Sequence, residues 1–385
     1  MSISTPGVRH PSLEPGRIGD LELANRLAVS PMTRVSATPD GTPTHKMADY
    51  YAELARGGFG LVITEGTYTD TVYSQGYLNQ PGIVSEAHVA AWRETTDRVH
   101  AAGSPIVLQL MHAGALSQGS HYREDTAGPS AVPPLGEKMP EYGGHGRWAT
   151  PREMNPADIE EAVRGFVASA VNAREAGFDG VEVHGANGYL LDQFLTDYTN
   201  RRDDSYGGPI ANRVRLAAEV VAAIRAEVGS SFCVGIRLSQ TKVNDFTYRW
   251  PGSAHDAGVI FTALADAGVT YLHIASEGRD WIETARLEGG VTITGLARRV
   301  SGLPVIANGG MHEPAQAAQV LADGHADVLS VGRWALANPD LPRRLAEGAA
   351  LEDFDHMMLQ PMATLDNARR WRAAGVRGRG LSPRA

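Results

Sequence analysis

The fold is decided by the stretch PVIANGGMHEPAQAAQVLADGHADVLSVGR, residues 304–333. An apolar run opens it, a second apolar run closes it, and residues 314–321 between them have the period of a helix. Gly324 follows the helical segment, and glycine just past a helix end takes the left-handed conformation at little steric cost. This order of strand, helix and strand predicts one parallel βαβ unit.

The same unit recurs along the chain. Eight apolar runs have the length of strands: LAVSPM from Leu27, GLVITEG from Gly60, PIVLQL from Pro105, DGVEVHG from Asp179, FCVGIRL from Phe232, YLHIAS from Tyr271, PVIANGG from Pro304 and DVLSVG from Asp327. Segments of helical period, each followed by glycine, include residues 86–102, 156–176, 210–228 and 254–267. Several runs are apolar almost throughout, which is typical of strands covered on both faces.

Eight such units predict the α/β class and a closed (β/α)8 TIM barrel. A doubly wound open sheet is the alternative, but no GxGxxG follows the first run. Residues 111–155 interrupt the rhythm with Gly, Pro and His, so we expect a long excursion loop after the third strand. We expect one barrel domain over residues 1–385, with a tail from 353 to 385 whose Arg-rich end is solvated.

Composition narrows the class of function. The 385 residues are 43% hydrophobic and 21% charged, with a formal net charge of −9, which favours a small-molecule substrate over nucleic acid or an anionic membrane surface. No leader or spanning segment is recognisable, so we expect a cytoplasmic protein. The single cysteine, Cys233, excludes an all-cysteine iron–sulfur cluster within the chain, and we expect it to be buried.

The last two strands end in glycine-rich segments. Gly309 and Gly310 follow the seventh strand, and Gly332 and Arg333 follow the eighth. In TIM barrels these two loops often bind a phosphate, because glycines let backbone N–H groups approach its oxygens. Arg333 adds a cation for a charge-assisted contact. The sequence therefore predicts a phosphate site, although a phosphate alone does not identify a ligand.

The fourth strand ends in His184, Asn187 and Tyr189. The first two side chains can direct donors at one oxygen, and a tyrosine with an ordinary pKa near 10 can give a proton at neutral pH. This combination suits a carbonyl substrate. The alternative is structural, with a capping asparagine beside packed His and Tyr side chains.

Three segments carry a resemblance to a known family. NRLAVSPMTR from Asn25, QLMHAG from Gln109, and HGANGYLLDQFLTDYTNRRDDSYGG from His184 resemble the Old Yellow Enzyme family of FMN-containing ene-reductases. The match keeps its order from about residue 21 to residue 337. The resemblance implies a TIM-barrel oxidoreductase with FMN as cofactor and NADH or NADPH as reductant.

The resemblance also implies which residues bind FMN. Pro31, Met32 and Thr33 match the segment beside the isoalloxazine, and Gly66 matches a small residue that lets the ring approach the backbone. The remaining matches are to the pyrimidine edge and the phosphate, namely Gln109 and Arg237 for the former and Gly309, Gly310, Gly332 and Arg333 for the latter.

By the same matching, His184 and Asn187 hold the oxygen of an α,β-unsaturated carbonyl compound. The flavin N5 then passes a hydride to the β-carbon, and Tyr189 protonates the α-carbon. The same site run oxidatively, as a desaturase of a natural-product intermediate, is an alternative that the sequence leaves open. A flavin-binding protein without turnover is less favoured because the three residues are intact.

The chain departs from the family in places. Thr33 stands where one branch has cysteine, and Met111 stands where many relatives have an aromatic residue. We expect the mouth of the site to be lined by the loop with Tyr142, Gly143, Gly144 and His145 and by the aromatic group of Phe246, Tyr248 and Trp250. A metal-dependent aldolase barrel using His112, Glu182 and His184 is the rival enzyme class, but no ligand spacing supports a metal. By analogy and prevalence, we expect a homo-oligomer.

Overall fold

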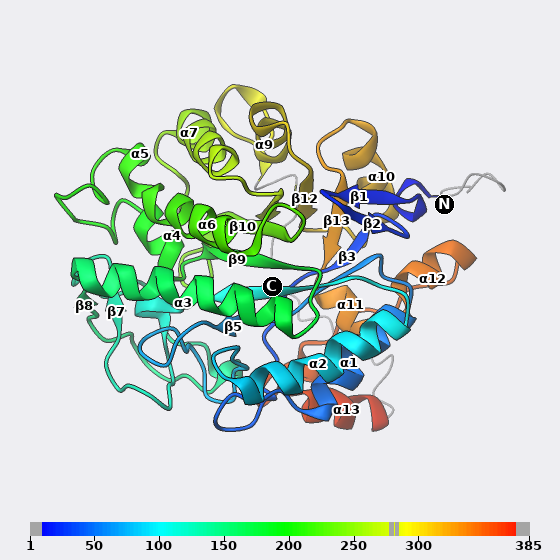
Figure 1. Ribbon diagram of the computed structural model, residues 1–385. Helices are drawn as coiled ribbons and strands as arrows, with labels where there is room; N and C mark the ends of the chain where they lie inside the picture. The colour runs from blue at the N-terminus through cyan, green and yellow to red at the C-terminus, as the bar shows by residue number, and fades with distance from the viewer. Residues whose placement is uncertain (1–9, 277–280, 282–284, 375–385) are drawn as a thin grey trace.

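The computed structural model describes residues 10–276, 281 and 285–374. Its main sheet is a closed ring of eight parallel strands, in which β4 pairs with β6 to complete the circle (Figure 1). The ring consists of β3 (Leu27–Val29), β4 (Leu61–Ile63), β6 (Ile106–Met111), β9 (Gly180–Asn187), β10 (Cys233–Lys242), β11 (Tyr271–Ala275), β12 (Val305–Asn308) and β13 (Val328–Val331). The predicted TIM barrel is confirmed.

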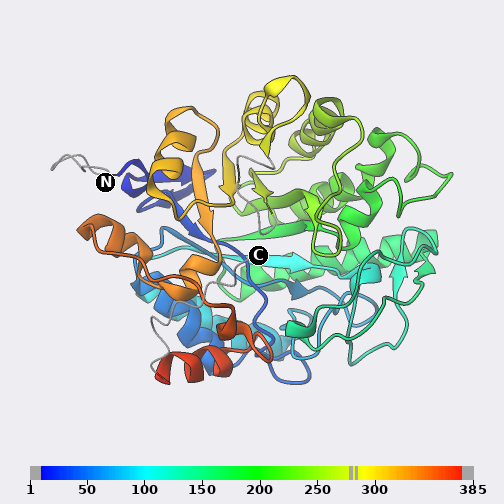
Figure 2. The same cartoon turned by 180° about the vertical axis from the view of Figure 1, so that it is seen from behind.

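Helices surround the ring, as Figures 1 and 2 show from opposite sides. They are α1 (His45–Arg56), α2 (Glu86–Ala101), α3 (Pro156–Glu175), α4 (Leu190–Leu195), α5 (Ile210–Arg213), α6 (Arg215–Val228), α7 (Ser253–Asp266), α9 (Ile293–Ser301), α10 (Pro314–Ala322), α11 (Arg333–Ala337), α12 (Leu341–Glu347) and α13 (Leu365–Ala373). The predicted single helix over 210–228 is wrong in one respect, because it is divided between α5 and α6 around Val214. In the part of the chain that the structure describes, no helix is long and apolar enough to cross a membrane.

The predicted glycine punctuation is confirmed. All five glycines that follow the predicted helices have positive φ, from 69° to 90°, namely Gly103, Gly177, Gly229, Gly268 and Gly324. In this conformation the chain reverses from each helix into the next strand without steric cost. Inside the barrel, Gly235 serves a different purpose, because a Cβ there would lie 2.1 Å from the ring of Tyr271 on the neighbouring strand.

The two ends of the barrel differ. A hairpin of β1 (Gly16–Ile18) and β2 (Leu21–Leu23) packs Ile18 and Leu23 against residues at the N-terminal ends of the strands, including Cys233, which is buried as predicted. The hairpin therefore closes the bottom of the barrel. The C-terminal ends of the strands stay open to the loops, which is where TIM barrels build their sites.

The excursion after β6 is present, and it carries two short paired strands, β7 (Ala127–Gly128) and β8 (Arg152–Glu153). The tail packs on the barrel before its Arg-rich end. Within the described part of that end, Arg369 and Arg370 are exposed, in line with the prediction. Elsewhere in the described tail Met358 and Leu365 are buried, and α13 lies beside α1 in both views (Figures 1 and 2). Ion pairs join the two helices, among them Lys46 with Asp366 at 2.7 Å. The end of the Arg-rich segment, residues 375–385, lies outside the described residues.

Candidate active site

A cavity of about 670 Å³ lies at the C-terminal ends of the strands. All thirteen residues that the sequence nominates line it: Pro31, Met32, Thr33, Gly66, Gln109, His184, Asn187, Tyr189, Arg237, Gly309, Gly310, Gly332 and Arg333. They come from seven of the eight strands or from the segments directly after them. The barrel therefore brings together residues up to about three hundred positions apart, while their individual roles stay predictions.

One end of the cavity is rich in glycine. Gly309 and Gly310 leave β12 with φ of 109° and 68°, and Gly332 and Arg333 leave the adjacent strand β13. Asn308, the last residue of β12, ties this strand to β13 and to the segment after β3, because its Nδ2 donates to the Ser330 carbonyl at 3.1 Å and to Ser30 Oγ at 2.9 Å. This end offers backbone donors and one guanidinium, the chemistry that a phosphate requires.

The segment beside the middle of the cavity is held from behind by Glu65. Its Oε2 accepts the backbone N–H of Arg34 at 2.7 Å, which fixes the chain just after Thr33. Gly66 follows Glu65 in the chain, and a Cβ on Gly66 would lie 2.5 Å from the sulfur of Met111. Only glycine leaves Met111 its place on the cavity wall, so the small residue nominated from the sequence has a steric cause.

Gln109 and Arg237 form the opposite end, on β6 and β10. Gln109 Nε2 donates to the buried Glu182 at 2.8 Å, and Arg237 Nη1 lies 3.2 Å from Nε2 of His273. An amide and a guanidinium at a cavity wall suit the carbonyl and N–H groups of a pyrimidine edge.

His184, Asn187 and Tyr189 share one wall. The ring of Tyr189 meets that of His184 edge-on with centroids 4.9 Å apart, and the Tyr189 hydroxyl hydrogen-bonds the hydroxyl of the buried Tyr77. Burial and then the charge of Arg237 lower the pKa of His184 to about 3, so its imidazole is neutral at pH 7. Among the described residues, none hydrogen-bonds His184 Nδ1 or Asn187 Oδ1. His184 Nδ1 can donate to a carbonyl oxygen, and Asn187, whose Oδ1 only accepts, can do so through its NH₂ group.

The turn that carries Asn187 is strained and strongly held. Asn187 has φ of 66°, and the next residue, Gly188, donates its N–H to Asp192 at 2.7 Å. Lys242 reaches the same carboxylate at 2.8 and 2.9 Å, and both charged side chains are buried. Gln193 adds a bond from its Nε2 to the Gly188 carbonyl at 2.7 Å. These contacts hold Asn187 in a conformation that an isolated chain disfavours.

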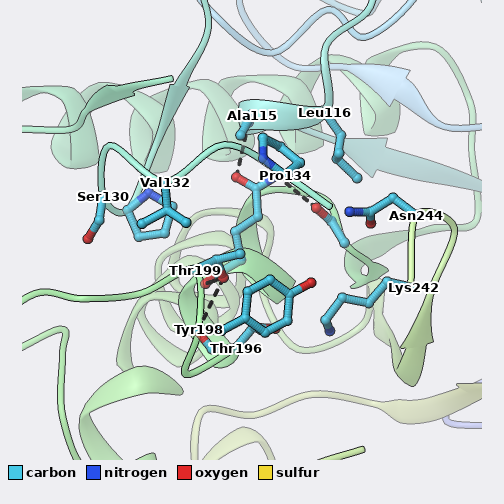
Figure 3. Close-up of a pocket in the computed structure, with 13 residues that line it drawn as sticks. Ala115, Leu116, Ser130, Val132, Pro134, Thr196, Tyr198, Thr199, Lys242 and Asn244 are labelled. Atoms are coloured by element: carbon cyan, nitrogen blue, oxygen red, sulfur yellow. Dashed lines mark hydrogen bonds between the residues drawn. The ribbon is translucent and has the colours of Figure 1, made fainter. Parts of the chain in front are cut away.

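Figure 3 shows the far side of this turn, where Lys242, Asn244 and Tyr198 surround a second, much smaller cavity. Its volume is about 10 Å³, which is the space of roughly one water molecule. It cannot hold a substrate. The large cavity, which all thirteen nominated residues line, is the candidate active site.

The mouth is built partly as predicted. Tyr142 from the excursion and Phe246 line the cavity. The neighbours of Tyr142 in the loop, residues 143–145, are not among the lining residues. The predictions for Tyr248 and Trp250 are wrong, since Tyr248 packs against Tyr198 and Trp250 is buried against Phe261 on α7. The sequence also gave no sign of His356 and Leu359, which reach the cavity from the tail. No local pattern marks them, because only the path of the whole chain brings the tail back to the strand ends.

The residues of the rival metal site do not converge. His112 lies 3.6 Å from Asp70, whereas Glu182 is paired with His273 at 2.8 Å. Across residues 10–276, 281 and 285–374, no group of three or more His, Cys, Asp or Glu side chains has an arrangement that could hold a metal ion.

The donor set of the cavity fits FMN. The glycine and arginine end matches its phosphate, Gln109 and Arg237 match its pyrimidine edge, and Gly66 and Met111 line the wall between them. His184 and Asn187 keep polar atoms for a further ligand.

Comparisons with known proteins give the same answer. Residues 13–352 match the model of the NADH:flavin oxidoreductase / NADH oxidase family. A putative 12-oxophytodienoate reductase 2 of Oryza sativa subsp. japonica is 37% identical over 348 residues, covering 90% of this chain and 89% of that protein. An NADH oxidase of Thermoanaerobacter brockii is 34% identical over 342 residues, covering 86% of this chain but only 50% of the relative. The structure of the old yellow enzyme homologue from Zymomonas mobilis superposes with a TM-score of 0.81 at 32% identity, covering 92% of this chain and 98% of that one.

Proposed function

The chain belongs to the Old Yellow Enzyme family of FMN-dependent NADH:flavin oxidoreductases, and from this premise we propose that it reduces the activated C=C bond of α,β-unsaturated carbonyl compounds. The observation that supports this substrate class is the shared wall of His184, Asn187 and Tyr189. Two side chains that can hydrogen-bond a substrate oxygen and one that can give a proton lie together beside the expected flavin site. A substrate with one carbonyl and one conjugated carbon that needs a proton uses all three.

His184 and Asn187 bind and orient the carbonyl oxygen. Because His184 is neutral, it donates one hydrogen bond without placing a full charge next to Arg237. Both donors gain strength as negative charge moves onto the substrate oxygen, and that gain lowers the barrier. Loss of one such donor typically slows the reaction by about a hundredfold or more.

Tyr189 supplies the proton to the α-carbon. It is nine-tenths buried or more, and its contacts with His184 and Tyr77 fix the direction of its ring. When bound, FMN supplies the hydride for the β-carbon, having taken it from NADH or NADPH. Gln109 and Arg237 would bind its pyrimidine edge, and Gly309, Gly310, Gly332 and Arg333 its phosphate. The proton taken from Tyr189 is regained from solvent in each cycle.

The test separates the two half-reactions. Purified enzyme is reduced anaerobically with NADPH or NADH and then mixed with 2-cyclohexenone while flavin absorbance is followed. We expect bleaching and then recovery of the oxidised spectrum. Tyr189→Phe should bleach at the normal rate and recover much more slowly. Bleaching with no recovery on any activated alkene would contradict the proposed reduction, and unchanged recovery in Tyr189→Phe would contradict the proton donor.

A further inference from the structure

Glu182 is a buried charge on β9 for which the proposed reaction has no role. Its two oxygens accept three hydrogen bonds, from Gln109 Nε2 at 2.8 Å, from the Tyr271 hydroxyl at 2.9 Å and from His273 Nδ1 at 2.8 Å. Glu182, Tyr271 and His273 are all completely buried. An ionised carboxylate this deep is costly unless it is fully paired.

The carboxylate is ionised. Burial by itself raises its pKa, but the contacts with His273, the charge of Arg237 and the hydrogen bond from Gln109 outweigh it and lower the pKa to about 2. An ionised carboxylate only accepts hydrogen bonds. The Gln109 atom that faces Glu182 must therefore be its NH₂ group, which leaves the Gln109 carbonyl oxygen for the cavity that Gln109 lines.

The same logic fixes the tautomer of His273. Because Glu182 only accepts, His273 Nδ1 carries the hydrogen. Burial lowers the pKa of His273 despite the nearby carboxylate, so the ring is neutral and its Nε2 accepts. Arg237 Nη1 lies 3.2 Å from this atom, and a guanidinium can only donate, so Arg237 is a donor to it; Ser330 Oγ lies beside it at 2.8 Å. Hydrogen bonds thus run in one direction from Arg237 through His273 to Glu182.

We propose that Glu182 and His273 are positioning residues that present the Gln109 carbonyl and the Arg237 guanidinium to the pyrimidine edge of FMN, and that the Glu182 charge holds down the flavin's midpoint potential. The inference rests on the flavin site of the family and not on the alkene substrate. Two-electron reduction adds negative charge at that edge, where nearby protein charges tune a flavin. Arg237 favours this charge, and Glu182 offsets part of the effect from beneath.

The first test is Glu182→Gln in the holoenzyme, with the midpoint potential measured by anaerobic titration against a reference dye. For charges about 10 Å apart at an effective dielectric constant of about 20, the repulsion between Glu182 and the reduced flavin corresponds to roughly a tenfold change in binding. We expect binding of reduced over oxidised FMN to improve about tenfold, which corresponds to a potential about 30 mV higher for a two-electron couple. An unchanged or lower potential would overturn the proposal.

Two controls separate charge from packing. Glu160→Gln makes the same change of charge on the exposed side of α3, where the carboxylate side chain is 72% exposed, and should leave the potential unchanged. Tyr271→Phe removes a hydrogen bond from the same buried cluster but keeps its charge. Tyr271→Phe should lower the melting temperature. It should change the ratio of the affinities for reduced and oxidised FMN by less than threefold. A shift as large as that of Glu182→Gln would refute the electrostatic role.

His273→Asn tests the positioning of Arg237, and it serves alone if Glu182→Gln does not fold. The Asn Nδ2 can still donate to Glu182, but the acceptor for Arg237 is lost. We expect FMN to bind the apoprotein about tenfold more weakly or worse, with the potential less affected than in Glu182→Gln. Affinity within threefold of the wild type would overturn the positioning role. Neither readout uses an alkene, so these outcomes are independent of the proposed substrate.

Discussion

Tyr77 allows the proposed proton transfer to be tested one residue behind the donor. It is completely buried and hydrogen-bonds the Tyr189 hydroxyl. Burial and the neighbouring Tyr189 raise the pKa of Tyr77 well above 10, so it keeps its proton throughout turnover. Once Tyr189 has given up its own proton, only Tyr77 can donate within this pair. A hydrogen bond contributes about 0.5–1.5 kcal/mol to a neutral acceptor and about 1.5–3 kcal/mol to a charged one.

The difference, about 1–1.5 kcal/mol, is the stabilisation that appears only as Tyr189 becomes charged, and it corresponds to roughly tenfold in rate. Stopped-flow measurement of Tyr77→Phe should therefore show reoxidation by an enone about tenfold slower, with flavin reduction by NADPH unchanged. Tyr73→Phe, which removes a hydrogen bond to Asp125 elsewhere, is the matched control. Equal slowing of both half-reactions, or of neither, would refute the reasoning.

Three further predictions concern the walls of the site. Lys242→Met leaves Asp192 buried and unpaired, so the free energy of unfolding should fall by about 3–5 kcal/mol, and a calorimetric melting temperature within a degree of the wild type would contradict this. The pKa of His184 is about 3 in the folded chain and about 6.5 in the unfolded one, so the unfolded chain binds the proton more readily. The free energy of unfolding should therefore keep its full value above pH 6.5 and fall by up to about 4–5 kcal/mol as the pH drops towards 3. His184→Gln should flatten the dependence of unfolding free energy on pH over this range, and parallel curves would exclude the assignment. Met111 is buried against Gly66 in the cavity wall, so the larger side chain of Met111→Trp should project into the cavity. The kcat/KM for a bulky cyclic enone should then fall about five- to hundredfold, whereas that for a small enal should change little. An equal loss for both substrates would argue against a steric effect.

The barrel could be predicted because each of its units is local. A buried strand, a helix and a glycine at positive φ leave their pattern within about thirty residues, as from Pro304 to Arg333. Local pattern also accounts for the errors. Periodicity alone did not detect the break between α5 and α6, and the aromatic spacing of Tyr248 and Trp250 carried no information about which side of the loop they would face.

The wall of the site could be predicted because the ends of parallel strands must meet. The residues behind the wall could not. Lys242 is 50 positions from Asp192, and His273 is 91 positions from Glu182, so no spacing in the sequence marks either pair. Glu182 could be singled out from the sequence as a charge in an apolar run and as a candidate metal ligand. Only the position of His273 in the fold shows that Glu182 is instead a hydrogen-bond acceptor.

Arg237 connects the pyrimidine end of the site with the wall of His184, which the sequence presents as separate groups. It belongs with Gln109 at the pyrimidine end, yet its charge also lowers the pKa of His184 on the carbonyl wall, second only to burial. Without that charge the pKa of His184 would lie closer to its ordinary value, with burial alone still lowering it. The Glu182 charge opposes Arg237 at both places, since it raises the pKa of His184. In the proposed roles, two buried groups of opposite charge therefore bear on both the electron affinity of the flavin and the protonation state of His184.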